Sequence, residues 1–176
     1  MGAKNIQLPV FIFLFSVIFS TGLFSQASKN EMSVKNQDLN DAAHSGDSVL
    51  FFKFFNAYKK EAKFNKDYAL LINCYSNLGS YYYYQNQITN AIKSFDSVCI
   101  EAKKHDKPET YATGLMNRGA SYYTNQQYAF ALRDYLEAEL KMQELKSSGI
   151  GGLQGNIALL YSEIEDLKNA KIYLFK

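Results

Sequence analysis

The sequence predicts an all-α protein that is built from stacked antiparallel helix pairs. The main observation is a pattern that occurs three times: a small residue, then Tyr, an apolar residue, Ala, and an aromatic residue or Leu, at offsets of +3, +9, +12 and +16. The three copies begin at Gly79, Gly119 and Ala158, so they follow one another by 40 and then 39 residues. Within each copy, apolar residues recur at spacings of three and four, which is the period of a helix that buries one side.

The central copy, Asn77 to Val98, consists of two predicted helices that meet at a polar turn. Gly79 lies in the middle of the first helix, where it costs about 1 kcal/mol relative to Ala. A glycine at such a place indicates that another backbone comes close. We therefore expect the small Ala91 of the second helix to pack against Gly79, with Tyr82 in the core.

Residues 1–25 have the pattern of a secretory signal peptide. Lys4 precedes an apolar run, Leu8 to Phe19, and small and polar residues follow. We expect cleavage near Ser25 and Gln26, and hence an exported protein that is periplasmic or associated with the cell envelope. The alternative is an uncleaved membrane anchor, because residues 8–24 are almost long enough to span a bilayer.

The next two segments differ sharply in composition. Residues 26–47 are mostly polar and are interpreted as a linker, with a short helix around residues 39–43. Residues 48–63 carry Phe and Tyr on one side and Lys, Asn and Glu on the other. This segment is expected to be the second helix of an earlier, incomplete unit, so that the repeat domain covers residues 48–176.

The repeated spacing resembles the tetratricopeptide repeat (TPR), a helix–turn–helix unit with Leu-Gly, Tyr, Ala and Phe at corresponding offsets. The resemblance covers residues 48–176. Its period is longer than the usual ~34 residues, Arg118 stands where the pattern has Leu, and Ala158 replaces Gly. It implies a superhelix in which the first helix of each pair lines a concave surface that binds a protein or peptide.

Charge and motifs argue against several classes of function. Nineteen basic and 17 acidic residues give a net charge of +2, so there is no electrostatic case for nucleic-acid binding. No H-E-x-x-H, G-x-S-x-G or P-loop motif occurs. The two histidines, His44 and His105, fall in predicted loops far apart in the sequence. We therefore expect no catalytic residues, no metal site and no cofactor.

One asparagine per repeat, at positions 77, 117 and 156, lies two residues before the small residue. The TPR resemblance directs these side chains into the concave groove, where amides can hold a peptide backbone of any sequence. The alternative is that each Asn bonds the backbone of a neighbouring helix. The predicted groove set is Asn77, Asn117, Asn156, Ser80, Tyr84 and Met116.

Tyr83 is an alternative to Tyr84 as the groove-facing tyrosine, and both could instead pack with only their hydroxyls in water. TPR arrays that grip a C-terminal carboxylate use Lys or Arg beside such an Asn. The corresponding positions here are uncharged, so a strongly acidic ligand tail is not expected; they are Ser76, Met116, Gly155, Ser80, Ala120 and Leu159.

Two cysteines in an exported chain raise the question of a disulfide. Cys74 lies near the start of one predicted helix and Cys99 near the end of its antiparallel partner, so their helix ends should be neighbours. The alternative is two unpaired, partly buried thiols.

The expected function is a non-enzymatic peptide- or protein-binding module outside the cytoplasm. Its Asn-, Lys-, Tyr- and Phe-rich composition and ~40-residue period resemble the sensor portions of bacterial signalling proteins, in which an exported array precedes a membrane helix and an output domain. A structural scaffold in an envelope complex and an accessory domain of a longer enzyme remain open. Because apolar residues at 172, 174 and 175 lack a following helix pair, we also expect an incomplete C-terminal end that self-associates through its last helix.

Overall fold

A computed structural model describes residues 30–176, and every regular element within that range is an α-helix. The predicted signal peptide, residues 1–25, lies outside the described residues. A helix over residues 30–45 comes first. It is followed by α2 (Ser48–Asn65), α3 (Tyr68–Tyr84), α4 (Ile88–Lys104), α5 (Pro108–Thr124), α6 (Tyr128–Glu144), α7 (Ile150–Glu163) and α8 (Leu167–Leu174).

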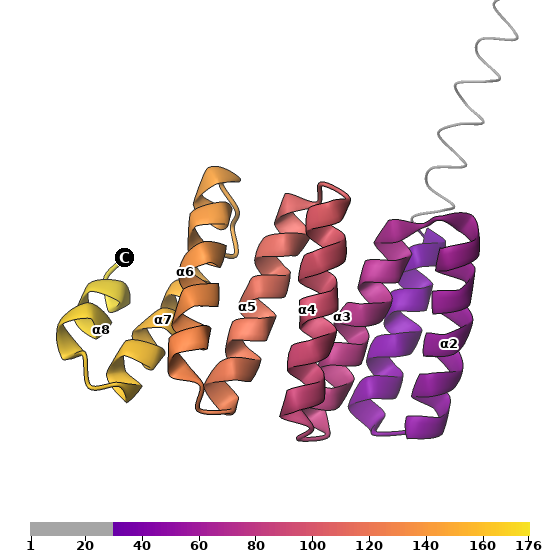
Figure 1. Cartoon of the computed structure of the whole chain (residues 1–176), viewed down its shortest axis with the longest axis horizontal. Coiled ribbons are helices and arrows are strands. Elements are labelled where there is room, and N and C mark those ends of the chain that lie inside the picture. The colour runs from indigo at the N-terminus through magenta and orange to yellow at the C-terminus, as the bar shows by residue number, and fades with distance from the viewer. Residues whose placement is uncertain (1–29) are drawn as a thin grey trace, which may run out of the picture.

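Consecutive helices pack against one another along the long axis of the molecule (Figure 1). The first helices of successive pairs are residues 30–45, α3, α5 and α7, and the second helices are α2, α4, α6 and α8. The predicted all-α superhelix of stacked antiparallel pairs is confirmed. None of the helices in residues 30–176 is both long and apolar enough to cross a membrane.

The turns between helices explain why the period is close to 40 residues. Helices α3 to α6 have 17 residues each. Each turn places one residue in the left-handed region, and these residues follow one another at intervals of about 20: Gly46, Lys66, Asn86, Asp106, Gln126, Lys146 and Glu165. Two 17-residue helices and two short turns of the same kind therefore make one unit.

The interpretation of residues 26–47 as a linker is wrong for residues 30–45, which form the first helix of a complete pair. Leu39 is fully buried and packs with Phe51 of α2 in one core cluster, together with Ala42 and Ala43. Leu39, Ala42 and Ala43 lie on one side of the helix, whereas Val34 is 60% exposed. Its mostly polar composition reflects the other side, which faces water.

Polar contacts also fasten this first pair together. The Lys35 ammonium lies 2.5 Å from a Glu61 carboxylate oxygen of α2. The Tyr58 hydroxyl of α2 donates to Asp38 at 2.6 Å. Burial, reinforced by this bond, raises the pKa of Tyr58 to about 12. The expected incomplete unit is therefore a full helix pair.

In the repeats that begin at Gly79 and Gly119, the glycine makes room for an aromatic ring. A Cβ atom on Gly79 would lie 2.6 Å from the ring of Phe95, and one on Gly119 would lie 2.7 Å from the ring of Tyr135. Ala91 is completely buried. The atoms nearest to each glycine thus belong to the ring four residues after the Ala, and at Gly119 the expected approach of the Ala is also present, since the Ala131 carbonyl oxygen would lie 3.4 Å from that Cβ.

The core tyrosine of the four-Tyr run is Tyr81 and not Tyr82. Tyr81 is 5% exposed, and its ring stacks on Phe51 with 4.3 Å between the centroids. Tyr82 is half-buried between two clusters. Adjacent residues on a helix point about 100° apart, so Tyr81 and Tyr82 face different neighbours. Tyr81 faces the first helix pair, which the sequence interpretation had left incomplete.

Arg118, which stands where the TPR pattern has Leu, joins three helices. Its Nε donates to Asp134 Oδ2 of α6 at 2.6 Å and its Nη2 to Asp134 Oδ1 at 3.1 Å. Its Nη1 donates to Asp96 of α4 at 2.5 Å. Because Asp134 is fully buried, the arginine provides the counter-charge that the buried carboxylate needs.

The two cysteines are unpaired and buried. Cys74 belongs to the core cluster around Phe51, whereas Cys99 belongs to the cluster around Leu115. Burial raises the pKa of both thiols to about 12, which leaves little reactive thiolate at neutral pH. The structure thus agrees with the alternative of two free thiols.

Glu139 of α6 fastens the last pair to the array. Its carboxylate accepts hydrogen bonds from Gln154 of α7 at 3.0 Å, Tyr173 of α8 at 2.8 Å and Lys176 at 3.0 Å. Burial alone would raise the pKa of Glu139, but these three bonds outweigh it and hold the pKa below its usual value. The bonds should therefore stabilise the pair at neutral pH and weaken as acid protonates the carboxylate.

Candidate ligand-binding furrow

Two hollows lie between α3 and α5, the first helices of successive pairs. One has a volume of about 230 Å³ and is lined by Ser80, Tyr83, Tyr84, Phe95, Asn117 and Ala120. The other has about 260 Å³ and is lined by Asn73, Ser76, Val98, Glu109, Thr110, Thr113 and Gly114. We call these lining residues together the α3–α5 furrow, and the first hollow the tyrosine hollow.

The furrow has polar walls and an apolar floor. Its floor consists of Phe95 and Val98 of α4, which are 3% and 2% exposed. Gly114 lets the wall of α5 approach this floor, because a Cβ there would lie 2.9 Å from Val98.

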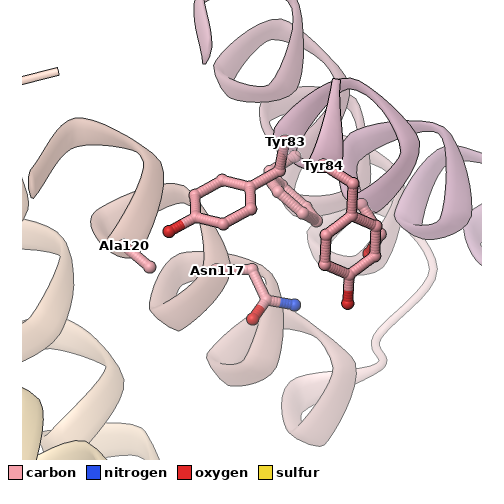
Figure 2. A pocket seen from close by; sticks show the side chains of 6 residues that line it. Tyr83, Tyr84, Asn117 and Ala120 are labelled. Atoms are coloured by element: carbon pink, nitrogen blue, oxygen red, sulfur yellow. The ribbon is translucent and has the colours of Figure 1, made fainter. Parts of the chain in front are cut away.

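Two tyrosines of α3 reach toward α5 at the tyrosine hollow (Figure 2). The Tyr83 hydroxyl lies 3.0 Å from Thr124 Oγ1, so it bridges the two helices. Tyr84 is 52% exposed, and its ring packs beside His44 with 4.5 Å between centroids. The hollow is therefore lined by two tyrosine rings, by side chains that carry hydroxyl groups and by the amide of Asn117.

The three recurring asparagines have different surroundings. Asn77 is 7% exposed, and its Nδ2 donates to Asn36 Oδ1 at 2.7 Å and to the Asn73 carbonyl at 2.9 Å. Asn117 is half-buried in the tyrosine hollow, and no described residue forms a hydrogen bond with its side-chain amide. Asn156 of α7 is half-buried and lines neither hollow.

The structure brings three of the six predicted groove residues together: Ser80, Tyr84 and Asn117. Asn77 instead bonds within the array, and Met116 packs against the core cluster that its own pair, α5 and α6, shares with α7. Tyr83, the sequence alternative to Tyr84, lies in the same hollow. The repeat register could have found one further pair of furrow positions, since Asn73 and Thr113 are 40 residues apart, as are Ser80 and Ala120.

The furrow carries little charge. The lining of the tyrosine hollow is uncharged, and Glu109 is the single charged residue around the second hollow. Within residues 30–176, no group of His, Cys, Asp and Glu side chains is arranged to hold a metal ion. The chemistry that the furrow offers is hydrogen bonding from amides and hydroxyls above an apolar floor.

Comparisons with known proteins identify the fold. The crystal structure of the apo form of RapI superimposes with a TM-score of 0.73 at 14% sequence identity, over 82% of this chain and 40% of RapI. The crystal structure of BtubC (BKLC) from P. vanneervenii superimposes with a TM-score of 0.58 at 18% identity, over 82% of this chain and 70% of BtubC. The fold is TPR-like.

These similarities concern the fold alone. The matched part spans less than half of the RapI chain. No family model matches the sequence, and no curated protein matches it.

Proposed function

We propose that this chain is a non-enzymatic module that binds a peptide, or an extended segment of a partner protein, in the α3–α5 furrow. The observation that carries the proposal is the half-buried Asn117 amide in a hollow beside Tyr84 and Ser80. A side-chain amide has two donor hydrogens and an acceptor oxygen, which match the groups of a peptide backbone.

The dimensions of the furrow suit a short extended segment. Its α5 wall runs from Glu109 to Ala120, which is about 16 Å at 1.5 Å per helical residue. An extended peptide rises about 3.3 Å per residue, so about five residues would cover this length. Asn117 would hold the backbone, while a side chain of the peptide contacts Phe95 at the floor.

Asn117→Ala should weaken peptide binding about tenfold while the free energy of unfolding changes by less than about 0.5 kcal/mol. The affinity falls because the peptide loses hydrogen bonds worth about 1 kcal/mol or more. Stability is preserved because the amide bonds no described residue. The probe is a peptide selected by the full chain from a phage-displayed random library, titrated by calorimetry.

Two equivalent asparagines provide matched controls. Asn77→Ala should cost about 1 kcal/mol of stability, because it removes the hydrogen bond that the buried Asn77 amide donates to Asn36, and should leave affinity nearly unchanged. Asn156→Ala should change neither quantity. Failure to select any peptide, or an Asn117→Ala chain that binds the selected peptide as tightly as the parent, would contradict the proposal.

Export and a sensing role are part of the same proposal. Their support is the signal-like pattern of residues 1–25 and the resemblance in composition and period to exported sensor arrays. If the leader is removed, mass spectrometry of the protein from its native host should find a chain that starts near Gln26. An intact Met1 on a membrane-bound product would favour the anchor instead.

A structural scaffold that binds through the opposite, second-helix surface is the second candidate. The observation in its favour is a set of exposed apolar side chains on α4 and α6: Ile100 is 57% exposed and Leu140 is 53% exposed. Ile100→Glu and Leu140→Glu would abolish such an interaction and leave peptide binding in the furrow unchanged.

A further inference from the structure

The lysines of this chain are unevenly distributed between the two edges of the array. The turns that join α2 to α3 and α4 to α5 lie on one edge, the upper one in Figure 1. These turns and their flanking helix ends, residues 63–68 and 103–109, carry five exposed lysines: Lys63, Lys66, Lys103, Lys104 and Lys107. We call these lysines, together with Phe64, the lysine edge. At the opposite edge, residues 84–90 and 124–130 carry no charged side chain.

The preference of cations for helix C-termini does not by itself explain this distribution. Lys63 and Lys103 lie in the last turns of α2 and α4, where the helix dipole favours them. Helices α3, α5 and α7 end at the opposite edge, however, and have no basic residue in the last turn. Lys66 and Lys107 lie outside the helices altogether. The positive charge therefore follows the edge of the array rather than the helix ends in general.

Most of the ammonium groups at the lysine edge have no carboxylate partner among the described residues. Lys104 lies 3.8 Å from a Glu101 oxygen, and the other four form no ion pair there. The same two segments contain three acidic residues, so their net charge is +2: Asp67, Asp106 and Glu109. The Asp67 carboxylate is engaged in capping α3, since it accepts a hydrogen bond from the Leu70 backbone at 3.0 Å. Unpaired positive charge therefore faces the solvent at this edge.

An exposed aromatic side chain lies among these lysines. Phe64 is 87% exposed and comes directly after Lys63. The Tyr68 ring stacks on His105 with 3.6 Å between the centroids, so the two turns adjoin and form one surface. Exposed aromatic rings enter the headgroup region of a bilayer, and lysines next to them are attracted to anionic lipids.

We propose that the lysine edge docks on a bilayer surface that contains anionic phospholipids. Phe64 enters the headgroup region, and the lysine ammonium groups lie against the lipid phosphates. Each lysine that is close to such a surface raises the affinity about fivefold. In this orientation the Glu109 end of the α3–α5 furrow is near the lipid, whereas the tyrosine hollow faces away from it and stays open to a ligand.

A fluorescent dye at either end of α2 tests the docking in the chain as its host produces it. Ser48 and Asn65 are the first and last residues of α2, and both are exposed. The native thiols are buried, so an environment-sensitive maleimide dye should react with an introduced cysteine. The dye on Asn65→Cys should shift to the blue with vesicles that contain phosphatidylglycerol, and less with phosphatidylcholine alone. The dye on Ser48→Cys should not show this dependence on lipid charge.

Two pairs of lysines at equivalent repeat positions provide the charge test, with the dye kept on Asn65→Cys. Lys63→Gln with Lys103→Gln should lower the affinity for the anionic vesicles about thirtyfold, because both lysines lie at the surface. Lys53→Gln with Lys93→Gln changes the net charge equally. These two exposed lysines lie ten residues earlier on the same helices, about 15 Å from the edge. This exceeds the Debye length of about 8 Å at physiological salt, so the affinity should change less than about twofold.

Two further variants separate the docking from other kinds of binding. Phe64→Ala should remove most of the blue shift, and Asn117→Ala should leave it unchanged, since the docking does not involve the furrow. Any membrane affinity of residues 1–29 is common to all these chains and does not affect the comparison. The proposal is overturned if the dyes at 48 and 65 respond alike, if the two lysine pairs have equal effects, or if the lysine edge binds DNA or heparin while the anionic vesicles stay unbound.

Discussion

Arg118→Ala is expected to lower the free energy of unfolding by about 3 kcal/mol. The substitution leaves the Asp134 carboxylate buried without its bidentate partner, and removing one member of a buried ion pair typically costs about 3–5 kcal/mol. We expect the lower end of that range because Arg133 still donates to Asp134 at 3.0 Å. Urea unfolding followed by circular dichroism measures the effect.

The double substitution Arg118→Leu with Asp134→Leu is the control. It removes both charges and restores the Leu of the TPR pattern beside Gly119, so it should recover most of the loss, because apolar replacements of a buried ion pair are often neutral or stabilising. A single Arg118→Ala chain as stable as the parent would show that the pair does not hold α5 on α6.

Gly79→Ala should destabilise the chain by about 1–3 kcal/mol, although Ala is the better helix former by about 1 kcal/mol. The new Cβ would lie 2.6 Å from the Phe95 ring, which is buried and cannot move away without displacing its neighbours. Thermal and urea unfolding of the variant would show the loss. Packing predicts a decrease in the free energy of unfolding, whereas intrinsic helix propensity predicts an increase. The direction of the measured change therefore decides between the two.

Gly155→Ala is the matched control for this prediction. Gly155 also lies inside a helix, but a Cβ there would meet nothing within 4 Å, so the substitution should stabilise the chain by about 0.5–1 kcal/mol. Combining Gly79→Ala with Phe95→Leu should recover part of the lost stability, since leucine is smaller than phenylalanine and leaves room for the new Cβ. Stabilisation by Gly79→Ala alone would mean that the Phe95 ring does not lie against Gly79.

Much of the fold was predictable from the sequence because each repeat has the same pattern of small, aromatic and apolar residues. The three small residues, the tyrosines and the alanines gave the period and the order of the helices from residue 48 onward. Helix 30–45 was predicted only as a short helix around residues 39–43, because its single fully buried Leu39 and its neighbouring alanines make a weak pattern. Its stability comes from packing on the aromatic residues of α2, which local sequence does not reveal.

The candidate site was predictable only in part, because equivalent positions have different neighbours. Asn77 and Asn117 are 40 residues apart and occupy the same repeat position. Asn77 donates to Asn36 of helix 30–45, a residue within the segment that was interpreted as a linker. Asn117 has Ser80 and Ala120 nearby in the tyrosine hollow instead. The recurrence of Asn therefore indicated that these residues lie on the same face of the first helix in each pair. Which of their side-chain amides is available to a ligand depends on the neighbouring helices.

The most direct test of the furrow as a binding site is a nuclear magnetic resonance titration of the isotope-labelled chain with the selected peptide. We predict that the largest chemical-shift changes occur at the amides of Ser80, Tyr83, Asn117 and Ala120, with smaller changes toward Thr113. Changes confined to the outer surface of α4 and α6, around Ile100 and Leu140, would contradict this account and favour binding through the second helices.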